Sequence, residues 1–274
     1  MTKRPYLHLV LFVLTVASTY WVGGALYSLS IMAILLSHEM GHYVASRRYG
    51  VPATLPYFIP FPPSPFGTFG AVIKMRGVIV NKRSLFDIGV AGPLCGFILA
   101  VPAACIGVHL STVVRVAKVT SPLLELGDPL LFRLLEWYMV RNLPPTYELV
   151  LHPVGYAAWV GLFVTALNLL PVGQLDGGHI VYAVFGERSA WVYRALIPIL
   201  LVLAFFYNAG WLVLVILLLV FGIHHPRPLD EETPLNRGRK AIAFVMLLVF
   251  VLSFTPAPFP GSSLKGLLLK VLAR

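Results

Sequence analysis

Long apolar runs separated by short polar or turn-forming stretches set the pattern of this chain. Runs of this length predict helices that cross a bilayer, because about 20 apolar residues span its hydrocarbon core. The expected spans are residues 6–23, 26–49, 87–110, 153–171, 190–207, 210–223 and 240–255. The pattern therefore predicts an all-α polytopic membrane protein with about six to seven transmembrane helices.

Two segments after the second expected span break the helical pattern. Residues 51–66 contain six prolines, too many for a helix, and residues 67–80 are β-branched and punctuated by glycine. Non-helical backbone at membrane depth must be shielded by protein or by a water-filled cavity. We therefore expect a β-hairpin at 67–80 that dips into the membrane beside the polar residues described below. A surface hairpin beneath the lipid headgroups is the alternative.

The connection at residues 111–152 is the longest polar stretch between spans. It contains an amphipathic segment at 129–141, whose Trp137 and Tyr138 suit the headgroup zone. We expect this segment to lie at the membrane interface.

Composition agrees with a membrane protein. Of 274 residues, 58% are hydrophobic and only 12% charged, with a mean hydropathy of +0.83. Soluble domains carry about 25% charged residues. The first apolar run is long and lacks a clear small-x-small cleavage site, so we expect a retained first span rather than a cleaved signal peptide.

The net charge of +10 predicts topology rather than nucleic-acid binding. The second span ends at Arg47 and Arg48, and Arg227, Arg237 and Arg239 follow the sixth, whereas the 111–152 loop is nearly balanced. This favours a cytoplasmic N-terminus, placement in the cell membrane and chemistry near the cytoplasmic side, although the basic C-terminal tail weakly opposes this topology. No basic stripe with interleaved aromatic residues predicts a nucleic-acid partner.

Only two cysteines occur, Cys95 and Cys105, in one apolar run. This number excludes a disulfide framework and argues against a cysteine-based zinc site. We interpret both as small buried residues.

The chemistry-bearing motif is His38-Glu39-Met40-Gly41-His42, at the end of the apolar run that begins near Ala25. Histidines four apart share one face of a helix and can each offer a nitrogen to zinc. Glu39 is then placed to take a proton from water. Gly41 permits another backbone or a substrate to approach. Unpaired ionisable groups within a bilayer are costly, so the motif predicts a zinc site.

A catalytic zinc usually has three protein ligands. Asp176 is the best candidate for the third, since Pro171 and Gly173 should end the preceding helix and place the aspartate on irregular chain in a cavity. Asn168 lies about two helical turns earlier on the same buried segment, where it could contact a substrate backbone or an oxyanion. The other candidates have no comparable neighbourhood: Asp87, Glu187, His8, His109, His152, His224 and His225.

At these residues the chain resembles the site-2 protease family of intramembrane zinc metalloproteases, peptidase family M50. That family pairs a membrane-embedded H-E-x-x-H with a distant N-x-x-P-x-x-x-L-D-G, which here is Asn168, Pro171, Leu175, Asp176 and Gly177. The resemblance also covers the glycine-rich hairpin and an Ala91-Gly92-Pro93-Leu94 turn. It implies that His38, His42 and Asp176 bind one Zn²⁺, that Glu39 is the general base and that Asn168 assists.

The resemblance implies one membrane-embedded protease domain, residues 1–274, with a catalytic core at about 25–186 and accessory helices and tail at 187–274. The implied function is cleavage of transmembrane segments of membrane proteins, with a transmembrane-helix protein as substrate and the bilayer as surroundings. A divalent-metal transporter and a non-catalytic helix-binding relative are the alternatives. His179, three residues past Asp176, could support a ligand or merely cap or pack.

Overall fold

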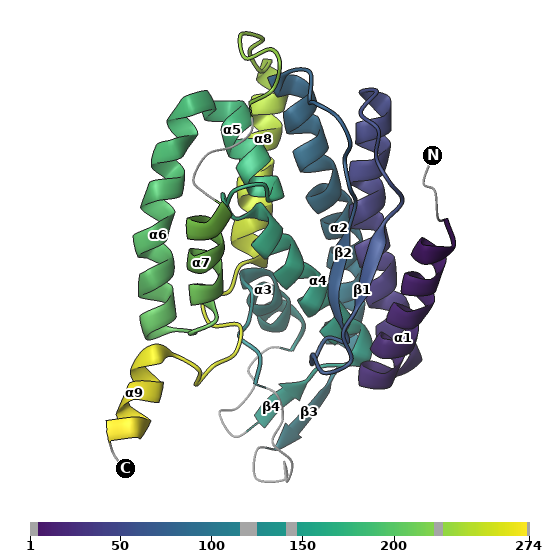
Figure 1. Ribbon diagram of the computed structural model, residues 1–274. Helices are drawn as coiled ribbons and strands as arrows, with labels where there is room; N and C mark the ends of the chain where they lie inside the picture. The colour runs from purple at the N-terminus through teal and green to yellow at the C-terminus, as the bar shows by residue number, and fades with distance from the viewer. Residues whose placement is uncertain (1–4, 116–124, 141–146, 222–226, 273–274) are drawn as a thin grey trace.

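The computed structural model describes residues 5–115, 125–140, 147–221 and 227–272, most of them helical (Figure 1). The helices are α1 Pro5–Arg48, α2 Lys82–Leu110, α3 Leu130–Met139, α4 Pro153–Leu169, α5 Asp176–Phe185, η2 Gly186–Arg188, α6 Ser189–Phe206, α7 Trp211–Phe221, α8 Arg237–Ser253 and α9 Leu264–Leu272. The strands are β1 Tyr57–Pro60, β2 Thr68–Val72, β3 Thr112–Arg115 and β4 Tyr147–Val150.

The first two expected spans form the two arms of α1. The break between them is Gly24, whose φ of 74° and ψ of −172° lie outside the helical region and suit a residue without a side chain. A hydrogen bond of 2.7 Å between the hydroxyls of Thr19 and Ser28 joins the arms across the break. The second arm carries the His38–His42 motif.

Three described helical segments are long and apolar enough to cross a membrane: Tyr6–Arg48, Lys82–Leu110 and Asp176–Phe206. Pro153–Leu169 and Trp211–Val220 are shorter apolar helices. Helices α6 and α7 pack against each other, as the short turn between them predicted. The chain is thus a mostly helical membrane protein, and the number of six to seven crossings stays a prediction.

Strands β1 and β2 form an antiparallel pair beside α1, with Tyr57 opposite Val72 and Phe58 opposite Ala71 (Figure 1). The strand expected within 67–80 is therefore present, but its partner lies in the proline-rich segment and not within 67–80. Pro60 ends the short edge strand β1, where a missing N–H is tolerated. The six prolines of residues 51–66 argued against regular structure there, so β1 was not predicted. The depth of the β1–β2 pair in the membrane stays a prediction.

The 111–152 connection contains more structure than its sequence indicated. Strands β3 and β4 pair antiparallel, with Thr112 opposite Val150, and α3 covers most of the expected amphipathic segment. Phe132 of α3 is fully buried, whereas Trp137 and Tyr138 are exposed. Helix α3 therefore has a buried and an exposed face, and its position at the membrane interface stays a prediction.

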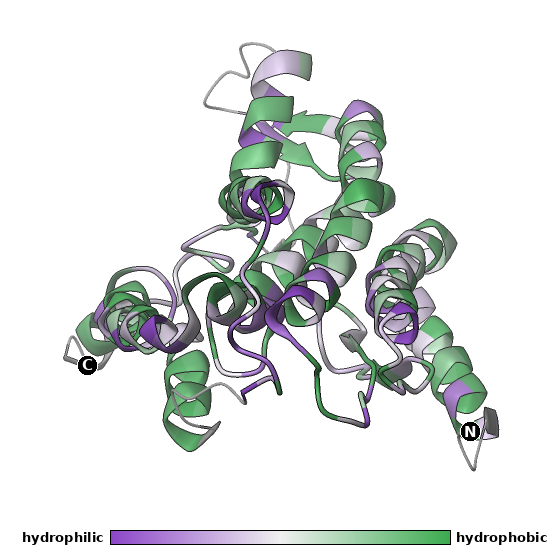
Figure 2. Cartoon of the chain, turned by 90° about the horizontal axis from the view of Figure 1, so that it is seen from above, coloured by the Kyte–Doolittle hydropathy of each residue, from purple (hydrophilic) through white to green (hydrophobic). Residues whose placement is uncertain are grey.

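The main core lies where α1, α2 and α4 meet, around the buried Tyr27, Ile31, Trp159 and Leu162. Large apolar side chains also cover the outer faces of helices, for example Trp21, which is 85% exposed. Figure 2 shows hydrophobic residues along the outer helices as well as between them. An apolar exterior of this kind suits contact with lipid.

A polar cluster joins three helices at the end where α2 and α8 begin. Arg239 of α8 donates to both carboxylate oxygens of Asp87 on α2, at 2.8 and 2.6 Å, and Tyr49, just after α1, also donates to Asp87. Arg239 is 152 residues from Asp87 in sequence.

Candidate metal centre

The last turns of α1 carry the first half of the site. His38, Glu39 and His42 are 4%, 6% and 7% exposed, so three ionisable side chains lie within the helical core. The four-residue spacing brings both imidazoles to one face of α1, with ring centroids 4.9 Å apart. Their shared orientation places both Nε2 atoms toward α5.

The turn between α4 and α5 carries the second half. Helix α4 ends at Leu169, the chain reverses through Pro171 and Gly173, and α5 begins at Asp176. The break was predicted correctly, but Asp176 opens a helix instead of lying on irregular chain. Its carboxylate at this helix start is favourably placed relative to the helix dipole.

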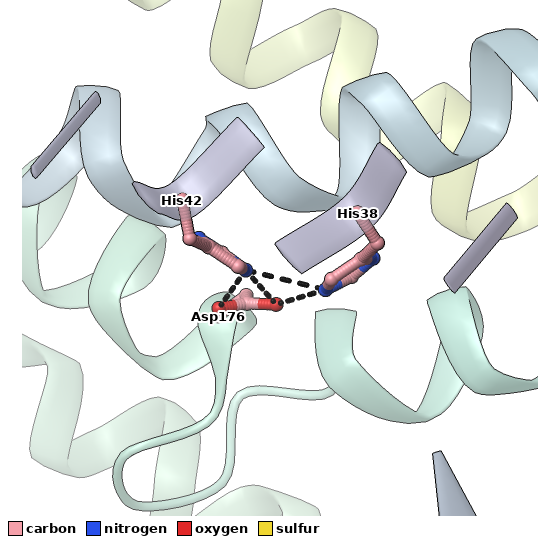
Figure 3. Close-up of side chains that lie close together, drawn as sticks. All are labelled: His38, His42 and Asp176. Carbon is pink, nitrogen blue, oxygen red and sulfur yellow. Dashed lines mark hydrogen bonds and ion pairs between the residues drawn. The ribbon is translucent and has the colours of Figure 1, made fainter. Parts of the chain in front are cut away.

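The structure brings His38, His42 and Asp176 together (Figure 3). Nε2 of His42 lies 3.2 Å from each carboxylate oxygen of Asp176 and 3.2 Å from Nε2 of His38. Nε2 of His38 lies 3.3 Å from Oδ2 of Asp176. One ligand atom from each residue lies within 4.8 Å of the others, which suits binding of one metal ion.

These separations fit a tetrahedral zinc. Ligands at 2.0–2.1 Å from the ion stand about 3.3–3.4 Å apart in that geometry. Nδ1 of His42 lies 2.8 Å from the carbonyl oxygen of Ile88, which can only accept a hydrogen bond. In the neutral imidazole, Nδ1 then carries the proton, so Nε2 turns a bare lone pair toward the Asp176 carboxylate. Acceptors that converge in this way suit a cation between them.

Glycines on α2 give the histidines room. A β-carbon at position 92 would lie 2.0 Å from Nε2 of His42, and one at position 96 would lie 3.2 Å from Nδ1 of His38. Gly41 in turn faces the backbone of α2, since its β-carbon would lie 2.4 Å from the carbonyl oxygen of Ala91. The expected Ala91–Leu94 turn is absent, because α2 continues as a helix through Pro93.

Asn168 and Glu39 flank the cluster. Nδ2 of Asn168, in the last turn of α4, lies 3.3 Å from Nε2 of His38. The backbone amide of Ile73, the residue after β2, lies close to the carboxylate of Glu39. All five residues expected at the site therefore lie in one place. The close backbone approach at Gly41 was predicted. The Ile88 carbonyl, the Ile73 amide and the roles of Gly92 and Gly96 were not, although Gly89, Gly92 and Gly96 recur at helical spacing.

The other candidate ligands have separate surroundings. Glu187 pairs with Arg227 at 2.5 Å, His152 caps α4 and Nδ1 of His8 lies 3.1 Å from the carbonyl oxygen of Pro56. His179 is buried on α5 against Gly89 and is not one of the three clustered ligands. His109 lies in the last turn of α2. His224 and His225 lie outside the described residues.

Both cysteines lie on α2 and are partly buried rather than fully buried. They are free thiols within the part of the chain that the structure describes. The three clustered ligands are two histidines and one aspartate.

A helical membrane protein with two histidines of an H-E-x-x-H helix beside a distant aspartate belongs to the class of membrane metalloproteins with a protease-type motif. The model of peptidase family M50 matches residues 26–207, and the chain belongs to this family. The match includes nearly all of the expected core at 25–186 and continues through α6.

Curated relatives include plant proteins. The chain is 31% identical over 243 residues to "Probable zinc metalloprotease EGY2, chloroplastic" of Oryza sativa subsp. indica, covering 87% of this chain and 43% of that protein. It is 31% identical over 230 residues to "Probable zinc metalloprotease EGY1, chloroplastic" of Arabidopsis thaliana, covering 82% and 42%. The chain thus spans less than half the length of these relatives, which are named chloroplastic rather than assigned to a cell membrane.

Proposed function

We propose that this chain is a zinc-dependent endopeptidase that cleaves transmembrane segments of membrane proteins. The observation that carries the proposal is the meeting of His38, His42 and Asp176 at ligand separations suited to zinc. Membership of peptidase family M50 and the zinc metalloprotease names of the relatives support it. His38, His42 and Asp176 would hold one Zn²⁺ per chain.

Bound zinc would supply Lewis acidity that makes water a nucleophile near neutral pH and polarises the scissile carbonyl. Glu39 accepts a proton from the attacking water, whose oxygen forms a bond to the carbonyl carbon. The carbon–nitrogen bond then breaks, and Glu39 returns the proton to the departing amine. One carboxylate therefore serves first as base and then as acid, which keeps the proton balance within the site.

Two further contacts orient the reacting groups. The Ile88 carbonyl accepts from Nδ1 of His42 and fixes the tautomer that leaves Nε2 free to bind the ion. The Asn168 amide next to His38 is placed to donate a hydrogen bond to the developing oxyanion or to the substrate backbone. Neither residue needs to change its ionisation during turnover.

A transmembrane helix has every interior backbone group paired, so a substrate must unwind locally before attack. Strand β2 offers an edge to the unwound segment, because β1 and β2 form only a two-stranded sheet among the described residues. Just beyond β2, Ile73 contacts Glu39, so a segment added to this edge would pass beside the general base. We propose that β2 aligns the substrate in this way.

Proline at Val72 tests this alignment. Val72→Pro should abolish cleavage while metal content stays unchanged, because proline disrupts the strand but not the ligand cluster. Val78→Pro, in irregular chain beyond the strand, is the matched control and should retain cleavage. Cleavage by Val72→Pro at the unmodified rate would refute the alignment.

We further propose that the metal centre receives water from the cytoplasmic side or its organellar equivalent. Arg47 and Arg48 end the helix that bears the motif, and His42 lies about 9 Å along the axis from Arg48. This orientation retains the expected cytoplasmic N-terminus. Cysteine labelling at Arg48 from each side of sealed vesicles tests it, and labelling from the opposite side would overturn it.

Cleavage of a detergent-solubilised single-span substrate tests the function. We expect cleavage by the purified chain, loss of cleavage with a chelator, and restoration by Zn²⁺. Glu39→Gln should retain the metal but lose about 10²–10⁴-fold in rate. Vesicle metal uptake that depends on this chain would favour the transporter alternative, and substrate binding without cleavage would favour the non-catalytic relative.

A further inference from the structure

A deep apolar groove lies behind the turn that presents Asp176. Its volume is about 810 Å³, and every described residue that lines it is apolar. The walls come from α5, α6 and α8, and the floor includes Leu169, Pro171 and Gly177 from the two sides of the α4–α5 turn. The groove therefore shares backbone with the metal centre but none of its ligands.

The position of the groove excludes direct delivery of a substrate to the metal. His38, Glu39, His42 and Asp176 are all absent from its lining. On α5, His179 lies against Gly89 of α2, whereas Ile180, Val181 and Val184 line the groove. A peptide in the groove would lie behind the catalytic turn, on the far side from Glu39.

The dimensions of the groove favour a thin aliphatic occupant. The lining runs from Val192 to Leu203 on α6 and from Ala243 to Phe254 on α8, about 17 Å along each helix. A helix with its side chains is about 10–12 Å across, whereas a hydrocarbon chain is narrower and needs no hydrogen-bonding partner.

One basic residue precedes the groove lining on each of α6 and α8. Arg188 precedes Val192 by four residues at the start of α6, and Lys240 precedes Ala243 and Phe244 by three and four residues at the start of α8. Residues at this spacing share a helix face, and Arg188 and Lys240 are both exposed. Helices α6 and α8 begin at the same end of the molecule, the upper end in Figure 1.

We propose that this groove binds an acyl chain of an anionic membrane phospholipid, with the phosphate of its headgroup between Arg188 and Lys240. The apolar walls provide a surface for the chain, and the two cations select the charge of the headgroup. The first halves of α6 and α8 thereby hold the lipid at a fixed depth. The bound chain packs against Leu169, Pro171 and Gly177 and supports the turn that carries Asp176.

Photolabelling tests the proposal without any dependence on proteolysis. The full chain is placed in phosphatidylcholine nanodiscs that contain a small fraction of phosphatidylglycerol with a photoreactive acyl chain. We expect labelled peptides from α5, α6 and α8, with labelling competed by unmodified phosphatidylglycerol but only weakly by phosphatidylcholine. Uniform labelling of all apolar helix faces would overturn the proposal.

Matched substitutions locate the acyl chain and the headgroup of the lipid. Ala243→Trp fills the groove and should lower labelling about tenfold, whereas Ala241→Trp, exposed on α8 and outside the lining, should leave it unchanged. Removing one cation, in Lys240→Gln or Arg188→Gln, should lower the preference for phosphatidylglycerol roughly fivefold. Arg194→Gln is the control, because the guanidinium of Arg194 lies over the Trp191 ring, and this variant should not change the preference for phosphatidylglycerol.

Two outcomes contradict the proposal even when every variant folds. Equal labelling of Ala243→Trp and Ala241→Trp would show that the acyl chain of the lipid does not enter the groove. Displacement of the photolipid by a single-span peptide, but not by phosphatidylglycerol, would identify a protein helix as the occupant. Because the readout is lipid labelling, either result leaves the proposed protease activity to be judged by its own assay.

Discussion

The two sides of α5 have opposite chemistry. Toward α1 and α2, Asp176 contacts two histidines and the backbone approaches closely at Gly89. Toward α6 and α8, Val181 and Val184 line a groove without any polar side chain among its described residues. A ten-residue helix thus separates a polar site that needs fixed geometry from an apolar surface. Substitutions on the two sides should have different consequences.

The largest effect is expected for Gly92→Ala on the metal side. The added methyl would lie 2.0 Å from Nε2 of His42, so the imidazole must leave its position. We expect metal content and cleavage both to fall by more than tenfold, since a displaced ligand weakens the whole site. Elemental analysis of the purified protein measures the metal.

Gly96→Ala is the graded control for this substitution. Its methyl would lie 3.2 Å from Nδ1 of His38, a distance that a small shift relieves. We expect a loss of no more than a few fold in cleavage, with metal retained. Equal retention of metal in both variants would show that Gly92 does not shape the site.

The next largest effect is expected at the contact that holds α8 to α2. Asp87→Asn removes the charge that receives two hydrogen bonds from Arg239. Because the pair is only partly buried, we expect a loss of about 1–3 kcal/mol in the free energy of unfolding. Thermal unfolding in detergent measures it. If Asp87→Asn and Arg239→Gln destabilise additively in the double variant, the two side chains are not coupled.

A smaller effect is expected for Val184→Ala on the groove side of α5. The side chain is 37% exposed, so its truncation should cost only about 0.5–1 kcal/mol of stability. Metal content should stay at one ion per chain, measured as for Gly92→Ala. Loss of metal in Val184→Ala would mean that the groove side also fixes the position of Asp176.

The smallest effect is expected at Glu136 of α3, away from the candidate spans. Burial, with repulsion from Asp128, raises the pKa of Glu136 to about 7, against an opposing attraction from Arg133. A raised carboxyl pKa stabilises the fold below the unfolded pKa, near 4.5, and this contribution disappears as pH rises through about 7. Glu136→Gln should therefore raise Tm by about 1–3 °C at pH 8 relative to wild type.

The same variant provides its own control at low pH. At pH 4.5 the wild-type glutamate is already protonated in the folded state, so Glu136→Gln should leave Tm unchanged there. A pH-independent difference in Tm would attribute the effect to packing.

The sequence predicted the residues of the metal site better than the long-range contacts that hold these residues in place. Histidines four apart and an aspartate after a proline- and glycine-broken helix are local patterns, and each retains its meaning without knowledge of the fold. The long-range contacts had no such signal. Arg239 reaches Asp87 across 152 residues, and Ile73 reaches Glu39 only because β2 lies along α1.

The β1–β2 pair shows why the alternation of side-chain types along the sequence was not enough to predict both strands. The strand at 68–72 has β-branched and aromatic residues that its sequence displays, but its partner at 57–60 lies among prolines that conceal it. Pairing between strands depends on tertiary position more than on local preference. Similarly, Asp176 begins a helix because the chain reverses at Gly173. The glycine permits this turn but does not specify that a helix follows it.

Whether Asp176 is the third ligand is tested by the zinc content of purified wild-type protein against Asp176→Ala, with Val184→Ala as a folded control from the same helix. We expect one zinc per chain in wild type and in Val184→Ala, and at least a tenfold weaker retention in Asp176→Ala, because two histidines alone hold the ion poorly. Full zinc occupancy in Asp176→Ala under competition with a chelator would contradict this expectation.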